Sequence, residues 1–94
     1  MYQLVQSQSY VNDEVKFRKS IPKFDNIIAA IEWGIARVPS AFEKIDTKIG
    51  KEIWLAKTNE FPDAPGLNFF FRITTPNECE LLAIMEAKRY EEEL

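Results

Sequence analysis

Three apolar-rich runs in the second half of the chain constrain the fold more than any other feature. They cover residues 52–58, 67–75 and 79–87, and turn-forming residues such as Pro62, Gly66 and Pro76 separate them. Apolar and polar side chains alternate within these runs, as they do in β-strands with two different faces. The short gap at residues 76–78 predicts a β-hairpin, and the three runs together predict a three-stranded antiparallel sheet.

The same alternation predicts which side chains share a face of that sheet. Strict alternation would place the three carboxylates of the last run along one face, where they are best interpreted as solvated charges: Glu78, Glu80 and Glu86. It would also leave large apolar side chains on a second face: Trp54, Phe70, Leu82 and Ile84. The helices of so short a chain suffice to cover one face only. The second face is therefore a predicted site for a second copy, as in a homodimer, or for a bound partner segment.

The first half of the chain predicts helices. Residues 22–38 carry one apolar stripe at helical spacing, formed by Phe24, Ile27, Ile28, Ile31, Ile35 and Val38. Pro22 suits the first turn of this helix and Pro39 ends it, while Trp33 lies beside the stripe and is expected to extend it.

The segments around this helix are less constrained by pattern. Ser40 and Glu43 form a capping box that predicts a second helix over residues 41–48, with Gly50 closing it. Residues 2–5 predict a short first strand. Residues 10–19 fit either a helix capped by Asn12 or a strand. We expect a single α+β domain: a short N-terminal strand, a helical hairpin, then the three-stranded antiparallel sheet.

Composition excludes several kinds of chemistry. The 94 residues contain no histidine and one cysteine, so Ser-His and Cys-His nucleophile pairs and thiolate zinc sites are excluded, and we expect no metal or cofactor. Neither a signal peptide nor a membrane span is predicted, and the lone Cys79 fits a reducing compartment, so we expect a cytoplasmic protein. The net charge is −3 and residues 51–94 carry the excess of acid, which does not favour nucleic acid.

A family resemblance rests on three stretches of the second half. Residues 50–55 read GKEIWL, residues 67–73 read LNFFFRI and residues 81–89 read LLAIMEAKR. With a short first strand and a helical pair before them, these strands resemble the RelE/ParE toxin superfamily of bacterial toxin–antitoxin systems. The resemblance implies a small α+β toxin, an antitoxin protein as partner, and messenger RNA on the ribosome as the target of the family's ribonuclease members.

The resemblance also implies site residues for a metal-independent, ribosome-dependent mRNA endoribonuclease. Arg89 matches a catalytic arginine at the end of the last strand, and Lys88 stands beside it. Cationic side chains there would stabilise charge building on the scissile phosphate. Near the start of the preceding strand, where the family has a second arginine, this chain has Asn68 or a phenylalanine, and Arg72 comes several residues later. The alternative is a non-catalytic protein of the same fold that acts by dimerisation or partner binding, with Arg72 paired to a glutamate at position 52, 80 or 86.

Overall fold

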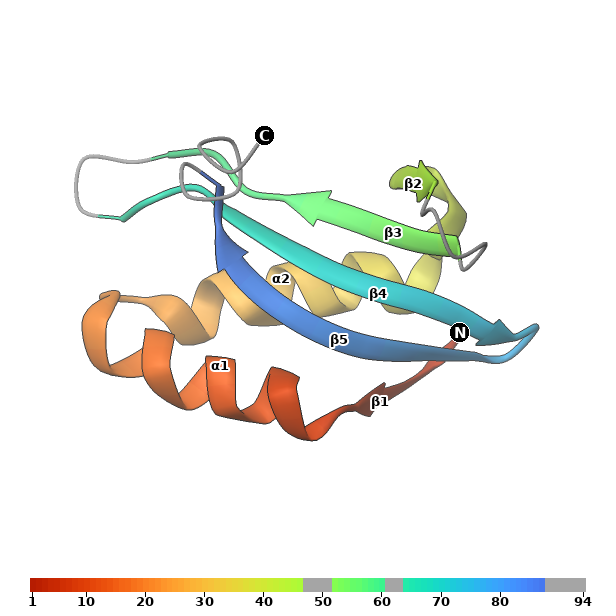
Figure 1. Cartoon of the computed structure of the whole chain (residues 1–94), viewed down its shortest axis with the longest axis horizontal. Helices are drawn as coiled ribbons and strands as arrows, with labels where there is room; N and C mark the ends of the chain where they lie inside the picture. The colour runs from red at the N-terminus through yellow and green to blue at the C-terminus, as the bar shows by residue number, and fades with distance from the viewer. Residues whose placement is uncertain (47–51, 61–63, 88–94) are drawn as a thin grey trace.

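Within residues 1–46, 52–60 and 64–87, which the computed structural model describes, the fold is a five-stranded mixed sheet with two helices (Figure 1). In chain order the elements are β1 (Gln3–Gln6), α1 (Gln8–Ser20), α2 (Phe24–Arg37), the 3₁₀ turn η1 (Pro39–Ala41), β2 (Glu43–Asp46), β3 (Glu52–Lys57), β4 (Leu67–Thr75) and β5 (Glu78–Glu86). The strand order is β1-β5-β4-β3-β2. The predicted α+β class is confirmed, but the predicted three-stranded antiparallel sheet is wrong, because β2 and a parallel β1 extend it at its two edges.

The predicted hairpin is confirmed as β4 and β5, which are antiparallel neighbours. Two register shifts interrupt their pairing, one between Phe70 and Phe71 and one between Ile73 and Thr75. At the first, Phe70 pairs with Ala83 and Phe71 with Leu81, so Leu82 is an extra, unpaired residue. A single extra residue reverses the alternation that follows it.

Two of the predicted face assignments are wrong. Because of the bulge, Ile84 pairs with Phe69 and is buried in the core. The register of β3 with β4 pairs Trp54 with Phe71, so Trp54 packs against the same core. Both had been predicted on the opposite face. The three glutamates are also divided: Glu80 faces away from the helices, whereas Glu86 pairs with the core residue Leu67.

The predicted second helix over residues 41–48 is wrong. Where the structure describes this segment it is the turn η1 followed by β2, and Gly50 lies outside the described residues. An isolated helix of eight residues gains little from its own hydrogen bonds. As a strand the segment pairs Ile45 with Ile53, and Lys44 Nζ lies 2.9 Å from Glu52 Oε1. Cross-strand pairing therefore outweighs the local capping signal.

The helical alternative for residues 10–19 is confirmed, although the cap is Ser7 rather than Asn12. Ser7 Oγ accepts a hydrogen bond from the Tyr10 N–H at 3.1 Å, which satisfies a donor of the first turn. The longer helix, α2, follows the predicted stripe but starts after Lys23, whose φ of 62° is left-handed.

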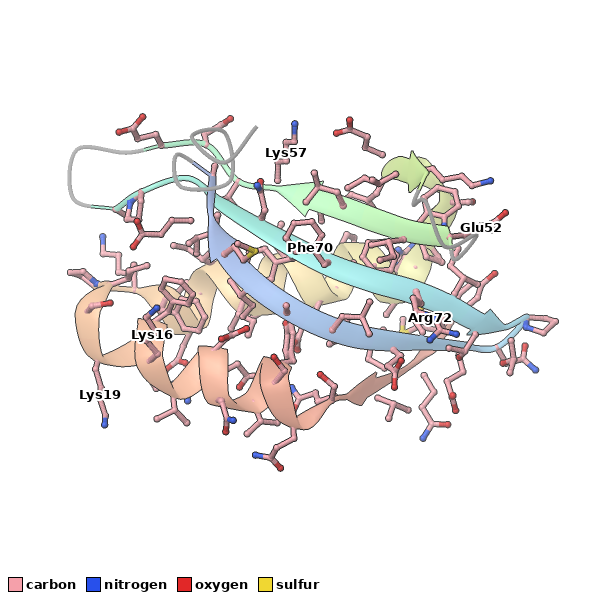
Figure 2. The ribbon with its side chains drawn as sticks, in the orientation of Figure 1. Lys16, Lys19, Glu52, Lys57, Phe70 and Arg72 are labelled. Carbon is pink, nitrogen blue, oxygen red and sulfur yellow. The ribbon has the colours of Figure 1, made fainter. Side chains whose placement is uncertain are left out.

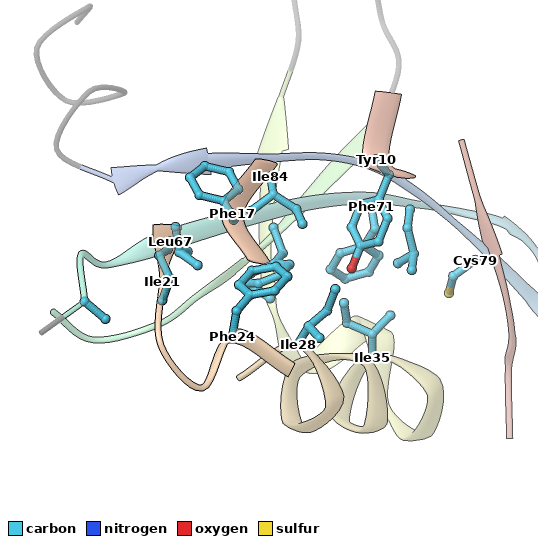
Figure 3. Packing of buried hydrophobic residues seen from close by; sticks show 14 residues of the cluster. Tyr10, Phe17, Ile21, Phe24, Ile28, Ile35, Leu67, Phe71, Cys79 and Ile84 are labelled. Carbon is cyan, nitrogen blue, oxygen red and sulfur yellow. The ribbon is translucent and has the colours of Figure 1, made fainter. Parts of the chain in front are cut away.

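Both helices cover the same face of the sheet, and the core lies between the two layers (Figure 3). Phe17 of α1, Ile21 just after it, and Phe24 and others of α2 pack against the helix-side residues of β3, β4 and β5. The sulfur of Cys79 is part of this core, and burial raises the pKa of its thiol. Trp33 was expected to join the core, but 61% of its surface is exposed.

Candidate functional site

Arg72 is the predicted catalytic residue that falls within the described part of the chain. It stands directly opposite Glu80 across the β4–β5 pair, and its Nη1 lies 3.7 Å from Glu80 Oε1. Both side chains are more than a third exposed, so the pair contributes little to stability. The pair matters for electrostatics, because the negative charge of Glu80 weakens the attraction of the Arg72 guanidinium for a phosphate. The predicted pairing of Arg72 with a glutamate is confirmed for Glu80.

The structure does not bring Arg72 near the end of β5. The N–H of Ala87, just after that strand, donates to the Gly66 carbonyl at 2.9 Å, so β5 ends beside the start of β4. Arg72 is six residues further along β4, which is about 20 Å at the rise of an extended strand. Figure 2 shows Arg72 close to the β4–β5 turn, at the other end of the hairpin. Lys88 and Arg89 themselves lie outside the described residues.

We call the sheet face turned away from the helices the outer face. Cross-strand register places Leu55, Phe70 and Ala83 in one row, and Lys57, Asn68 and Met85 in the next. Ile53 and Ile45 pair beside them on the same face. Leu55 is 3% exposed, while Phe70, Ala83 and Met85 are half-buried. The predicted second apolar face therefore exists, although its members differ from those predicted.

Two ion pairs flank the apolar centre of the outer face. Lys57 Nζ lies 3.4 Å from Glu43 Oε2 on the β2–β3 side, and Arg72 lies beside Glu80 on the side of the β4–β5 turn. Figure 2 shows Phe70 between these flanks, with Lys57 and Arg72 on either side of it. An apolar centre with a polar rim is the usual anatomy of a protein–protein interface.

Asn68 is a polar residue within this apolar surface. It is 1% exposed, and its Oδ1 accepts no hydrogen bond from the described residues. A buried acceptor without a partner costs about 1–3 kcal/mol, so it is seldom kept without a reason.

A groove of about 420 Å³ runs between α1 and β5, lined by Ser9, Asp13, Lys16, Phe17 and residues 83–86. The N–H of Ile84 donates to Asp13 Oδ2 at 3.0 Å, and Ser7 Oγ donates to the Leu82 carbonyl at 3.0 Å. The helix therefore occupies the edge of β5 beyond the end of β1. Sequence reasoning missed these contacts because they join residues more than 70 positions apart.

The described residues hold no constellation for acid–base or metal chemistry. No group of three or more potential metal ligands occurs among them. Tyr10 donates to Glu32 Oε2 at 2.8 Å, and burial, followed by the Glu32 charge, raises the pKa of its phenol well above the usual range. Burial and the same charge raise the pKa of Glu14. These groups lie between α1 and α2, where they link the helices.

Comparison with known proteins adds no family to these observations. No family model matches the chain, and neither the curated proteins nor the solved structures searched gave a match. Among the described residues, no helix has the length and apolar character needed to cross a bilayer.

Proposed function

We propose that this protein acts without catalysis, by binding a partner protein across the outer face of its sheet. The observation that carries the proposal is the apolar centre of that face, flanked by the Lys57–Glu43 and Arg72–Glu80 pairs. Where helices cover only one face of a largely antiparallel sheet, the other face normally carries polar side chains. Apolar side chains retained there are better explained by a partner than by the fold.

The partner that suits this face is a polypeptide segment with apolar anchors. Its apolar side chains would bury the half-exposed surface of Ala83 and Met85. An antitoxin segment, which the superfamily resemblance implies, meets this description. The neutralised Arg72 favours such a binding role over phosphate chemistry at that residue.

Two lysine substitutions test the proposal. Met85→Lys places a charge in the centre of the outer face, and Val15→Lys places the same charge on the exposed surface of α1, where 46% of Val15 is accessible. We expect the protein purified from its own cells to retain a specific partner, the Val15→Lys variant to retain it equally, and Met85→Lys to lose it. Lysine stems lie along apolar surfaces with little loss of stability, so both variants should fold. Identical retention by all three proteins would contradict the proposal.

A ribosome-dependent mRNA endoribonuclease is the second candidate, and Lys16 is the observation that favours it. Lys16 shares the α1–β5 groove with Glu86, the last residue of β5, so a cation lies at the end of the sheet from which the chain continues to Lys88 and Arg89. A phosphate bound in this groove would meet the Lys16 ammonium.

Expression in a bacterium tests this candidate. We expect growth arrest with cleaved messenger RNA, relief of the arrest by Arg89→Ala, and no relief by Lys44→Ala, which removes an equal charge from β2, at the edge of the sheet away from β5. Normal growth during verified expression of the folded protein would contradict the nuclease while leaving the binding proposal intact.

A further inference from the structure

The solvent side of α2 carries an unusual row of side chains. Asp25, Ala29, Trp33 and Arg37 are spaced four residues apart, and all four are exposed. We call this row the α2 ridge. Phe24, Ile28 and Ile35 are buried on the other side of the helix, whereas Ala36, next to Arg37, is buried on the ridge side, where the Tyr2 N–H donates to its carbonyl. An exposed tryptophan is uncommon on the solvent side of a helix, whereas tryptophan and arginine dominate the energetics of interfaces.

The side chains along the ridge are complementary to those of a second copy of the ridge that runs in the opposite direction. Residues separated by four positions form the surface ridges by which helices pack against each other. When two copies of α2 lie antiparallel about a two-fold axis near residue 31, Asp25 faces the second copy's arginine at position 37. Ala29 then faces its tryptophan at position 33. Each opposite-charge pair and each large-to-small pair occurs twice, as a two-fold interface requires.

The side chains are already arranged for this contact. The Arg37 guanidinium lies 4.6 Å from the centre of the Trp33 ring, which holds both on the same side of the helix. Asp25 is 70% exposed at its side chain, and its Oδ1 accepts from Arg18 Nε at 2.7 Å. This ion pair is exposed and therefore weak, so the arginine of a second copy would share the carboxylate with Arg18. Ala30 and Asn26, which flank the ridge, are also exposed and small enough to allow close approach of a second helix.

From this geometry we propose that the protein forms a two-fold homodimer through antiparallel packing of the α2 ridges. The partner on this surface is a second copy of the chain, because an antiparallel copy places opposite charges, and large and small side chains, against each other along the whole ridge. The dimer uses the helical side of the molecule and leaves the outer face of the sheet accessible, so it does not depend on the proposed partner-binding function. One helix from each copy makes a small interface, and we expect a dissociation constant of about 10–100 µM.

Sedimentation equilibrium of the intact chain over a concentration series tests the dimer. Trp33→Ala should weaken self-association by about tenfold or more, because it removes the central anchor on both copies. Val15→Ala removes an exposed apolar side chain from α1 and should leave association unchanged. Met85→Lys should also leave it unchanged, which separates this dimer from binding at the outer face.

Charge exchange gives the sharper test. The Asp25→Arg variant has positive charge at both ends of the ridge, and the Arg37→Asp variant has negative charge at both ends. Each variant alone should be monomeric, because like charges would face each other twice. An equimolar mixture should associate about tenfold or more above either variant, since both charge pairs are restored in the heterodimer. Circular dichroism establishes that the variants are folded. A wild-type monomer at all concentrations, or no association in the mixture, would overturn the proposal.

Discussion

The hydrogen bond between Tyr10 and Glu32 offers a direct measurement of how the two helices are held together. Tyr10 is completely buried, and its hydroxyl donates to Glu32 Oε2 at 2.8 Å. A hydrogen bond to a charged group contributes about 1.5–3 kcal/mol. Tyr10→Phe keeps the ring and removes the donor, so we expect a loss of about 2 kcal/mol in the free energy of unfolding, because water reaches the half-buried carboxylate and replaces part of the bond.

A double-mutant cycle in urea isolates the interaction. Glu32→Ala removes the acceptor and leaves a buried hydroxyl without a partner, whereas Glu32→Gln is the matched control that keeps an acceptor oxygen. We expect a coupling of about 1–2 kcal/mol between Tyr10→Phe and Glu32→Ala, and a smaller loss for Glu32→Gln alone. In a thermal scan the tyrosine variant should melt about 8–16 °C lower, given the entropy of unfolding of a chain this size.

The same bond has a defined pH dependence. Burial, followed by the Glu32 charge, raises the pKa of Tyr10 in the folded state above that in the unfolded state. Its contribution to stability is therefore complete below the unfolded pKa of about 10 and declines as pH rises beyond it. The stability difference between wild type and Tyr10→Phe should be constant from pH 6 to about 9. Additive effects in the cycle, within about 0.3 kcal/mol, would refute the assignment of this hydrogen bond as a helix–helix link.

Three further substitutions give independent outcomes by denaturant unfolding. Asn68→Leu replaces an unsatisfied buried amide by an apolar side chain of similar size and should raise stability by about 1–2 kcal/mol; a loss would mean that Oδ1 has a partner. Asp13→Ala removes the acceptor of the Ile84 N–H and should cost about 1.5–3 kcal/mol, whereas no loss would show that water replaces the carboxylate. Burial and nearby charge raise the folded-state pKa of Glu14, so stability is lost as pH rises through that pKa; Glu14→Gln should therefore be more stable than wild type at pH 7 and equal to it below about pH 4.

The features that could be predicted from the sequence are those set by local pattern. The bounds of β4 follow its alternation, and α2 follows its apolar stripe, because each signal is contained within one element. Strand β2 was missed because its stability comes from pairing with β3, while the local signal at Ser40 and Glu43 favours a helix start. The bulge at Leu82 was missed for a related reason: the alternation of the sequence continues through it, and only pairing with β4 reveals the extra residue.

In the candidate site, too, some features could be predicted from the sequence and others depend on how the strands and helices pack. Strand pairing made Glu80 a predicted partner of Arg72, since opposite charges stabilise neighbouring strands, and the structure contains that pair. Membership of the outer face was predicted correctly for Phe70 and incorrectly for Trp54, because the latter depends on how β3 and β4 align. The exposure of Trp33 could not be predicted from composition, because it depends on which side of α2 packs against the sheet.

The edges of the sheet explain why side-chain surfaces, rather than strand addition, should carry the interactions of this protein. An uncovered strand edge is a general template for pairing with other chains. Here β1 occupies the edge of β5 as far as Leu81, and Ser7 and Asp13 of the α1 segment then bind the backbone at Leu82 and Ile84. A carboxylate accepting from a strand N–H blocks an incoming strand both sterically and electrostatically. The edge strands β1 and β2 are four residues long, and edges this short discourage strand addition. With the edge of β5 closed by the chain itself, we therefore expect specific association at faces whose side chains distinguish one partner from another, namely the outer face of the sheet and the α2 ridge.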